Sequence, residues 1–217
     1  MSWQSWSLLF LATVLTSASG GQGATDGMSR ADDLPKVKVL LFDFVSLPEK
    51  TQKQAQDRVA SIFHKAGVEM EWAPCSTGEG QLTLFPDCTG FKEAASVLLR
   101  ILPPARQKAK RDAASESMLS SRIVNVFWDR AQKESARLNV PLADMLAEII
   151  AHEVGHVFLG PNSHSPSGIM AAKWKPRDLI AISQGGYGFT RQQRELIQTE
   201  VRRRQPQQTA SGLPPIR

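Results

Sequence analysis

Residues 152–164 read HEVGHVFLGPNSH and contain three of the four histidines of the chain. His152 and His156 are four residues apart, so on an α-helix they lie on one face, one turn from each other. Two imidazoles in that arrangement reach one Zn²⁺ at about 2.0–2.1 Å each. Glu153 directly follows the first ligand, which suits a general base that takes a proton from a zinc-bound water. The motif therefore predicts a catalytic zinc site rather than two solvated histidines on a surface helix.

The residues around the motif predict the helix that it needs. Asn139 is the expected N-cap, and Pro141 is tolerated in a first turn. Gly160 and Pro161 predict the end of the helix, because glycine allows a left-handed turn and proline cannot continue the helix. Apolar residues repeat between these limits at helical spacing: Leu142, Met145, Leu146, Ile149, Ile150, Val154 and Val157.

A chain that reverses after this stop can bring His164 back beneath the metal as the third ligand. The rival third ligand is a carboxylate farther along the chain, such as Glu195. In either case three protein ligands leave the fourth position of the zinc open, which distinguishes a catalytic site from a structural one.

These residues resemble the active-site motif of the metzincin metalloproteases. That motif has His-Glu-x-x-His, a glycine turn, a third histidine and then a methionine in a tight turn beneath the metal. In the resemblance Gly160 is the turn glycine, His164 the third ligand and Met170 the turn methionine. The glycine and the third ligand lie four and eight residues after His156, where metzincins have three and six. The run GPNSHSPSGIM, residues 160–170, is also similar to small secreted bacterial proteins of the metalloprotease type.

The resemblance implies an α+β, zincin-like (metzincin-like) single domain, in which a small twisted mixed sheet is backed by helices and one helix carries the motif. It implies a zinc metalloendopeptidase that hydrolyses peptide bonds in a peptide or protein substrate, with Glu153 as general base and Met170 packed below the ligands. Tyr187 either assists the reaction or is an ordinary packing residue. Two alternatives stay open: a zinc-stabilised secreted binding protein with vestigial catalysis, and a zinc amidase acting on a non-peptide substrate.

The ends of the chain and its two cysteines indicate export. Residues 1–20 read as a signal peptide, since the apolar run at 8–15 is too short to span a bilayer, although no Lys or Arg precedes it. The remaining chain divides into a flexible segment (21–34), the catalytic domain (35–204) and a disordered tail (205–217). An even cysteine count in an exported chain predicts a disulfide between Cys75 and Cys88. We therefore expect a secreted or periplasmic protein.

The net charge of +5 and pI near 9.4 do not by themselves indicate a nucleic-acid partner. The basic residues cluster in runs that are usually solvated faces, and no aromatic residues are interleaved with them. We expect a monomer without nucleic acid and without a membrane span.

Period-two apolar runs, helical stripes and turn residues predict the following elements: strands at 36–45, 68–73, 95–102 and 123–128, helices at 48–66, 130–138, 176–182 and 190–204, and a surface loop at 105–120. His64 is expected on a helix surface, and 95–102 is the expected edge strand for an extended peptide.

Overall fold

Five strands form one mixed sheet, in the order β2-β1-β3-β5-β4, in the computed structural model of the protein. The structure describes residues 34–75, 95–104, 115–118, 122–175, 178–183 and 186–205. The strands are β1 (Lys36–Asp43), β2 (Glu69–Cys75), β3 (Ser96–Leu102), β4 (Ser115–Met118) and β5 (Ile123–Phe127). The first four strands in this spatial order run parallel, and β4 runs antiparallel to β5.

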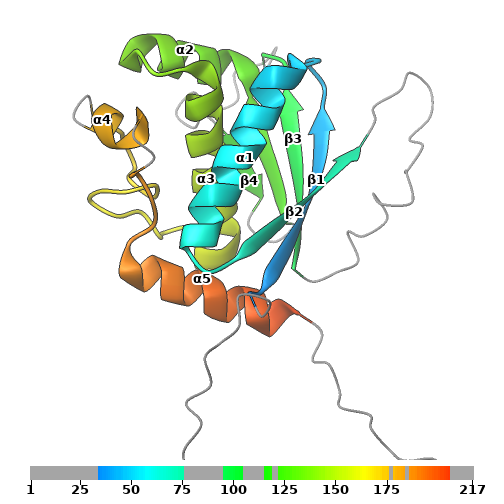
Figure 1. The fold of residues 1–217 in the computed structure, drawn as a ribbon, viewed down its shortest axis with the longest axis vertical. Helices are drawn as coiled ribbons and strands as arrows, with labels where there is room; N and C mark the ends of the chain where they lie inside the picture. The colour runs from blue at the N-terminus through cyan, green and yellow to red at the C-terminus, as the bar shows by residue number, and fades with distance from the viewer. Residues whose placement is uncertain are drawn as a thin grey trace, which may run out of the picture. The chain divides into compact units, whose positions relative to one another are not determined.

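Two long helices cover one face of this sheet and lie side by side (Figure 1). The helices are α1 (Glu49–Lys65), α2 (Trp128–Leu138), α3 (Leu142–Leu159), α4 (Asp178–Ser183) and α5 (Arg191–Arg204). The two that cover the sheet are α1 and α3, and α5 packs against α3. The α+β class, the mixed sheet and the helix that carries the His-Glu-x-x-His motif are all confirmed.

The core forms where alternate strand residues meet the apolar stripes of α1 and α3. Val37, Val39 and Leu41 of β1 are buried in it, because a strand points every second side chain to the same face. From α1, Val59 and Phe63 pack against them, both with no exposed surface. Burying an apolar side chain of this size stabilises a fold by about 1.5–3 kcal/mol. This packing holds α3, and with it the motif, against the sheet.

Asn139 does not cap the start of α3, so that prediction is wrong. It ends α2 instead, with a left-handed backbone (φ 54°) and its N–H donated to the carbonyl of Ala136. Asparagine tolerates this conformation, which terminates a helix, whereas an N-cap residue needs an extended backbone. Pro141 occupies the N-cap position of α3, and its carbonyl accepts the N–H of Met145 at 3.0 Å.

The expected edge strand is also wrong, because β3 lies in the interior of the sheet, between β1 and β5. Its residues Val97, Leu99 and Ile101 are buried, as is typical of a parallel strand enclosed within a sheet. The two edges of the described sheet are β2 and β4, and β4 lies inside the stretch expected to be a loop. Backbone contacts place β4 next to α3 as well as β5.

Several predictions concern residues outside the described ones: the signal peptide, the segment at 21–33, the tail after Gln205, and Cys88. The disulfide between Cys75 and Cys88 therefore stays a prediction. His64 is exposed on α1, as expected. Among the described helices, none combines the length and the apolar character that crossing a bilayer requires.

Candidate metal centre

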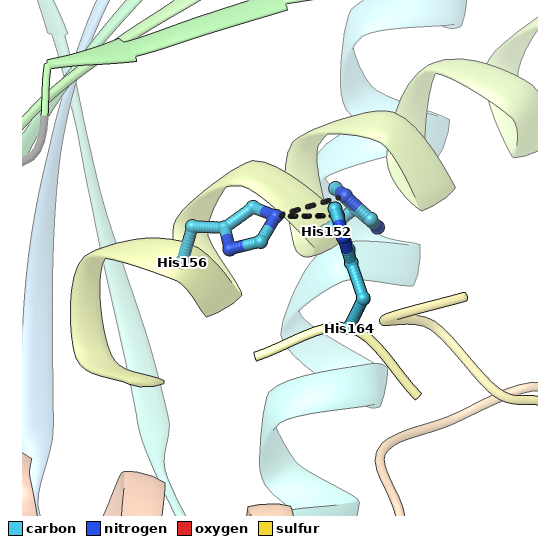
Figure 2. A group of neighbouring side chains, drawn as sticks. All are labelled: His152, His156 and His164. Carbon is cyan, nitrogen blue, oxygen red and sulfur yellow. Dashed lines mark hydrogen bonds between the residues drawn. The ribbon is translucent and has the colours of Figure 1, made fainter. Parts of the chain in front are cut away.

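Three imidazoles converge on one point beside the C-terminal half of α3 (Figure 2). The Nε2 atom of His156 lies 3.1 Å from Nε2 of His152 and 3.2 Å from Nε2 of His164. Nitrogen atoms bound to one tetrahedral zinc at about 2.0–2.1 Å stand roughly 3.3 Å apart. The spacing of these atoms is therefore the spacing of a zinc ligand set, with His152 and His156 from the helix and His164 from the loop after it.

Backbone carbonyls set the protonation of two of these rings. Nδ1 of His152 lies 2.8 Å from the carbonyl oxygen of Ile169, and Nδ1 of His156 lies 3.0 Å from that of Gly160. A carbonyl oxygen only accepts hydrogen bonds, so the hydrogen-bond network assigns the proton of each neutral ring to Nδ1. The Nε2 atoms of His152 and His156 are then bare lone pairs that face the common point.

Two lone pairs 3.1 Å apart repel each other unless a cation lies between them. While both rings are neutral and carry their proton on Nδ1, neither can relieve this repulsion by presenting an N–H to the other. The donor set also matches zinc, since neutral imidazole is among its preferred ligands and each ring is oriented by a second hydrogen bond. These three residues therefore fit a bound Zn²⁺.

Burial favours the neutral, metal-binding form of His152. Desolvation lowers the pKa of this imidazole from 6.5 to about 4, and the neighbouring rings of His156 and His164 act in the same direction. The hydrogen bond to the carbonyl of Ile169 opposes these effects but does not cancel them. His152 therefore stays neutral at every pH near 7.

Met170 lies beneath the histidines and approaches α3 closely at Gly155, where the absence of a side chain makes room for it. A Cβ atom added to Gly155 would lie 2.6 Å from Sδ of Met170 and 3.0 Å from Cε1 of Phe189. Met170 has no exposed surface, and the ring of Phe189 packs edge-on against that of Phe63 at 5.2 Å. Met170 therefore packs against α3 at Gly155, between His152 and His156, and its supporting role at the metal stays a prediction.

The turn that carries Met170 is fixed from three sides. Gly168 has a left-handed backbone (φ 83°), and a Cβ atom there would meet the carbonyl oxygen of Gly188 at 2.6 Å. The same carbonyl accepts the N–H of Ile169 at 3.0 Å, while the carbonyl of Ile169 faces His152. The carbonyl of Met170 accepts the N–H of Ser165 at 2.8 Å. The turn thus connects one helical ligand to the loop of His164.

The remaining candidate residues differ in their distance from the three histidines. Glu153 is 9% exposed and lies on α3 between the two helical ligands. Glu195, the rival ligand, is exposed on α5 and pairs with Arg191, outside the cluster of three histidines. The hydroxyl of Tyr187 is buried, and burial together with Asp178 raises its pKa. Among the described residues no hydrogen bond or ring contact joins Tyr187 to the imidazoles, and its place in the hydrophobic core favours a packing role for this tyrosine.

Four residues of the centre were not predicted from the sequence. Besides Gly155, they are Trp174, whose ring lies 6.0 Å from that of His152, and Ser163 and Gln193. Oγ of Ser163 lies 3.1 Å from Nδ1 of His156 and donates to the carbonyl of Gly160. The sequence does contain a signal for Gln193 as a capping residue, because Thr190-Arg-Gln-Gln193 has the Thr-x-x-Gln spacing of a capping box. The sequence contains no signal for the hydrogen bond from Gln193 to the carbonyl of Ser163.

Comparison with known proteins gives similarity of fold only. Neither a protein-family model nor a curated protein matches this sequence. Among solved structures, a zinc-dependent peptidase from Methanocorpusculum labreanum is similar at a TM-score of 0.48 and 14% identity, over 74% of this chain and 99% of that chain. An archaemetzincin from Methanopyrus kandleri is similar at a TM-score of 0.48 and 19% identity, over 77% of this chain and 95% of that chain. The assignment of the site therefore depends on the side chains of this chain.

Proposed function

We propose that this chain is a zinc-dependent metalloendopeptidase with Glu153 as its general base. The observation that carries the proposal is the convergence of three Nε2 atoms, two of them on rings whose Nδ1 atoms face backbone carbonyls. Three protein ligands leave a coordination position for water or substrate, as catalytic zinc sites do. When bound, zinc polarises a carbonyl group and lowers the pKa of water towards about 7.

The chain's own residues supply proton transfer and substrate alignment. Glu153 accepts one proton from the attacking water and gives it to the leaving amine as the C–N bond breaks. The second water proton leaves the carboxylic acid product and is taken up by the amine, so the products are a carboxylate and an ammonium group and both atoms and charge balance. An extended peptide can pair with the outer edge of β4, because this strand ends the described sheet and contacts α3. β4 replaces β3 as the candidate substrate strand.

The direct test combines metal analysis with the substitution Glu153→Gln. We expect about one zinc per chain in both proteins, and hydrolysis of casein and of fluorogenic peptides to fall by about 10²–10⁴-fold in the variant. Glu195→Gln is the matched control, since the same change on exposed α5 should leave zinc content and hydrolysis unchanged. Undiminished hydrolysis by Glu153→Gln would remove this residue from the proposed role.

The same assays separate the two alternatives. A zinc-stabilised binding protein would hold the metal but release no peptide, with or without a chelator. A zinc amidase would cleave non-peptide amides and leave peptides intact. Chelator-sensitive peptide hydrolysis by the wild-type protein excludes the first and shows that peptides are substrates.

We also propose that the protein is exported as a monomer with its two cysteines joined. The apolar run at 8–15, followed by small residues at 18–20, supports export. N-terminal sequencing of the exported protein should begin shortly after Gly20. Alkylation without reductant should leave Cys75 and Cys88 unmodified, and gel filtration should give the mass of one chain. Modification of both cysteines would remove the disulfide from the proposal.

A further inference from the structure

His164 is the ligand that the structure holds least directly. It is exposed and lies on a loop, whereas His152 and His156 are part of α3 and have their Nδ1 atoms hydrogen-bonded. Within the described residues, no hydrogen bond to Nδ1 of His164 is found. The position of its ring is therefore set by the backbone on either side, over a connection that runs eight residues from His156.

The backbone is anchored on both sides of His164. On one side, the N–H of Ser165 donates to the carbonyl of Met170 at 2.8 Å, and Ser165 forms a parallel bridge with Ala171. On the other side, the carbonyl of Ser163 accepts a hydrogen bond from Nε2 of Gln193 at 3.3 Å. The second anchor comes from α5, thirty residues further along the chain.

Gln193 is itself held in the orientation that this contact needs. Its side chain is 8% exposed, and its Oε1 accepts the N–H of Thr190 at 3.0 Å. The hydroxyl of Thr190 in turn accepts the N–H of Gln193, which completes a capping box at the start of α5. With Oε1 occupied by the cap, Nε2 is directed to Ser163, whose hydroxyl contacts Nδ1 of His156.

We propose that Gln193 is a positioning residue of the metal centre, which sets the place of His164 by holding the carbonyl of Ser163. The proposal rests on the proposed function, since it requires that the three histidines bind zinc. The competing explanation is that Gln193 serves only the cap of α5. The two explanations differ in what happens to zinc affinity when the cap alone is removed.

The test is Gln193→Glu at a pH where the new carboxylate is ionised, because it then keeps an oxygen for the N–H of Thr190 but cannot donate to the carbonyl of Ser163. We expect a 10- to 100-fold loss of zinc affinity, measured by competition with a chromogenic chelator. Thr190→Val is the matched control, because it removes the hydroxyl of the cap and leaves the Gln193–Ser163 contact in place. It should lower the Tm of the chelated protein while zinc affinity changes less than about threefold.

A second variant and a second measurement keep the test informative if one variant does not fold. If the buried carboxylate of Gln193→Glu prevents folding, Gln193→Met takes its place, because methionine has a similar length and no polar atoms. Gln193→Met should lose zinc affinity to a similar extent. The visible spectrum of the Co²⁺-substituted Gln193 variant should shift towards that of His164→Ala. Unchanged affinity in both Gln193 variants, or an equal loss in Thr190→Val, would overturn the proposal. Absence of zinc binding by the wild-type protein would instead overturn the proposed function.

Discussion

Gly155→Ala is predicted to destabilise the protein, although alanine is the better helix former. In an exposed helix interior the change from glycine to alanine stabilises by about 1 kcal/mol. Here the new Cβ atom would lie 2.6 Å from Sδ of Met170, where optimal contact between non-bonded atoms is about 3.5–4.0 Å. Both Met170 and Phe189 are buried, so neither side chain can move into solvent.

The two effects have opposite signs, and the packing effect is the larger. Forcing an extra methyl group into a well-packed core costs about 1–3 kcal/mol. We therefore expect a net loss of up to about 2 kcal/mol in the free energy of unfolding. Zinc affinity should fall too, because the displaced Met170 segment carries the carbonyl of Ile169 that orients His152.

The assay is urea unfolding of the chelated protein in a double-mutant cycle with Met170→Ala. The single change Met170→Ala should cost about 2–5 kcal/mol by leaving a cavity. In that background Gly155→Ala should become neutral or stabilising, which gives a coupling energy of at least about 1 kcal/mol. Equal effects of Gly155→Ala in the two backgrounds, or stabilisation of the wild-type protein, would refute the packing argument.

Two further predictions concern buried ionisable groups. Because the pKa of His152 is about 4 in the folded protein and 6.5 when unfolded, its contribution to stability is complete above pH 6.5 and is lost as the pH falls towards 4. The chelated protein should lose at most about 3 kcal/mol over this range in urea titrations, and His152→Asn should flatten the curve; an equally steep curve would contradict this assignment. Glu148 has no exposed surface and its Oε1 accepts Nε and Nη2 of Arg58 at 3.0 and 2.8 Å. Arg58→Met should therefore cost about 3–5 kcal/mol in denaturant unfolding, and adding Glu148→Leu should recover much of it; no recovery would indicate that the loss lies elsewhere.

The metal ligands could be predicted because their geometry is local. His152 and His156 need only a helix between them, and the apolar spacing before Gly160 predicts that helix and its end. His164 is less local, yet the glycine break predicts a reversal, and the structure places its Nε2 at 3.2 Å from that of His156. These inferences depend on residues that are close together in the sequence, and such residues are also close together in space.

The errors arose where distant parts of the chain decide the outcome. β3 reads as a strand, but its interior position depends on β5 pairing beside it and β4 beyond that. β4 has the sequence Ser-Glu-Ser-Met, with no apolar alternation to reveal it. Gln193 can be recognised as a capping residue, but its hydrogen bond to Ser163 depends on how α5 packs against α3. Asn139 failed for another reason, since the same residue type favours both ends of a helix.

Most of α3 is enclosed by the sheet and by neighbouring helices, and among its buried residues are Met145, Ala147, Ile150 and Val154. A helix secured in this way owes its formation to hydrophobic packing, unlike small zinc domains that unfold without the ion. Emptying the site should leave a folded protein that regains its ion without passing through an unfolded chain. Metal supply in the surrounding medium, rather than synthesis of new protein, would then govern how much of the population is active.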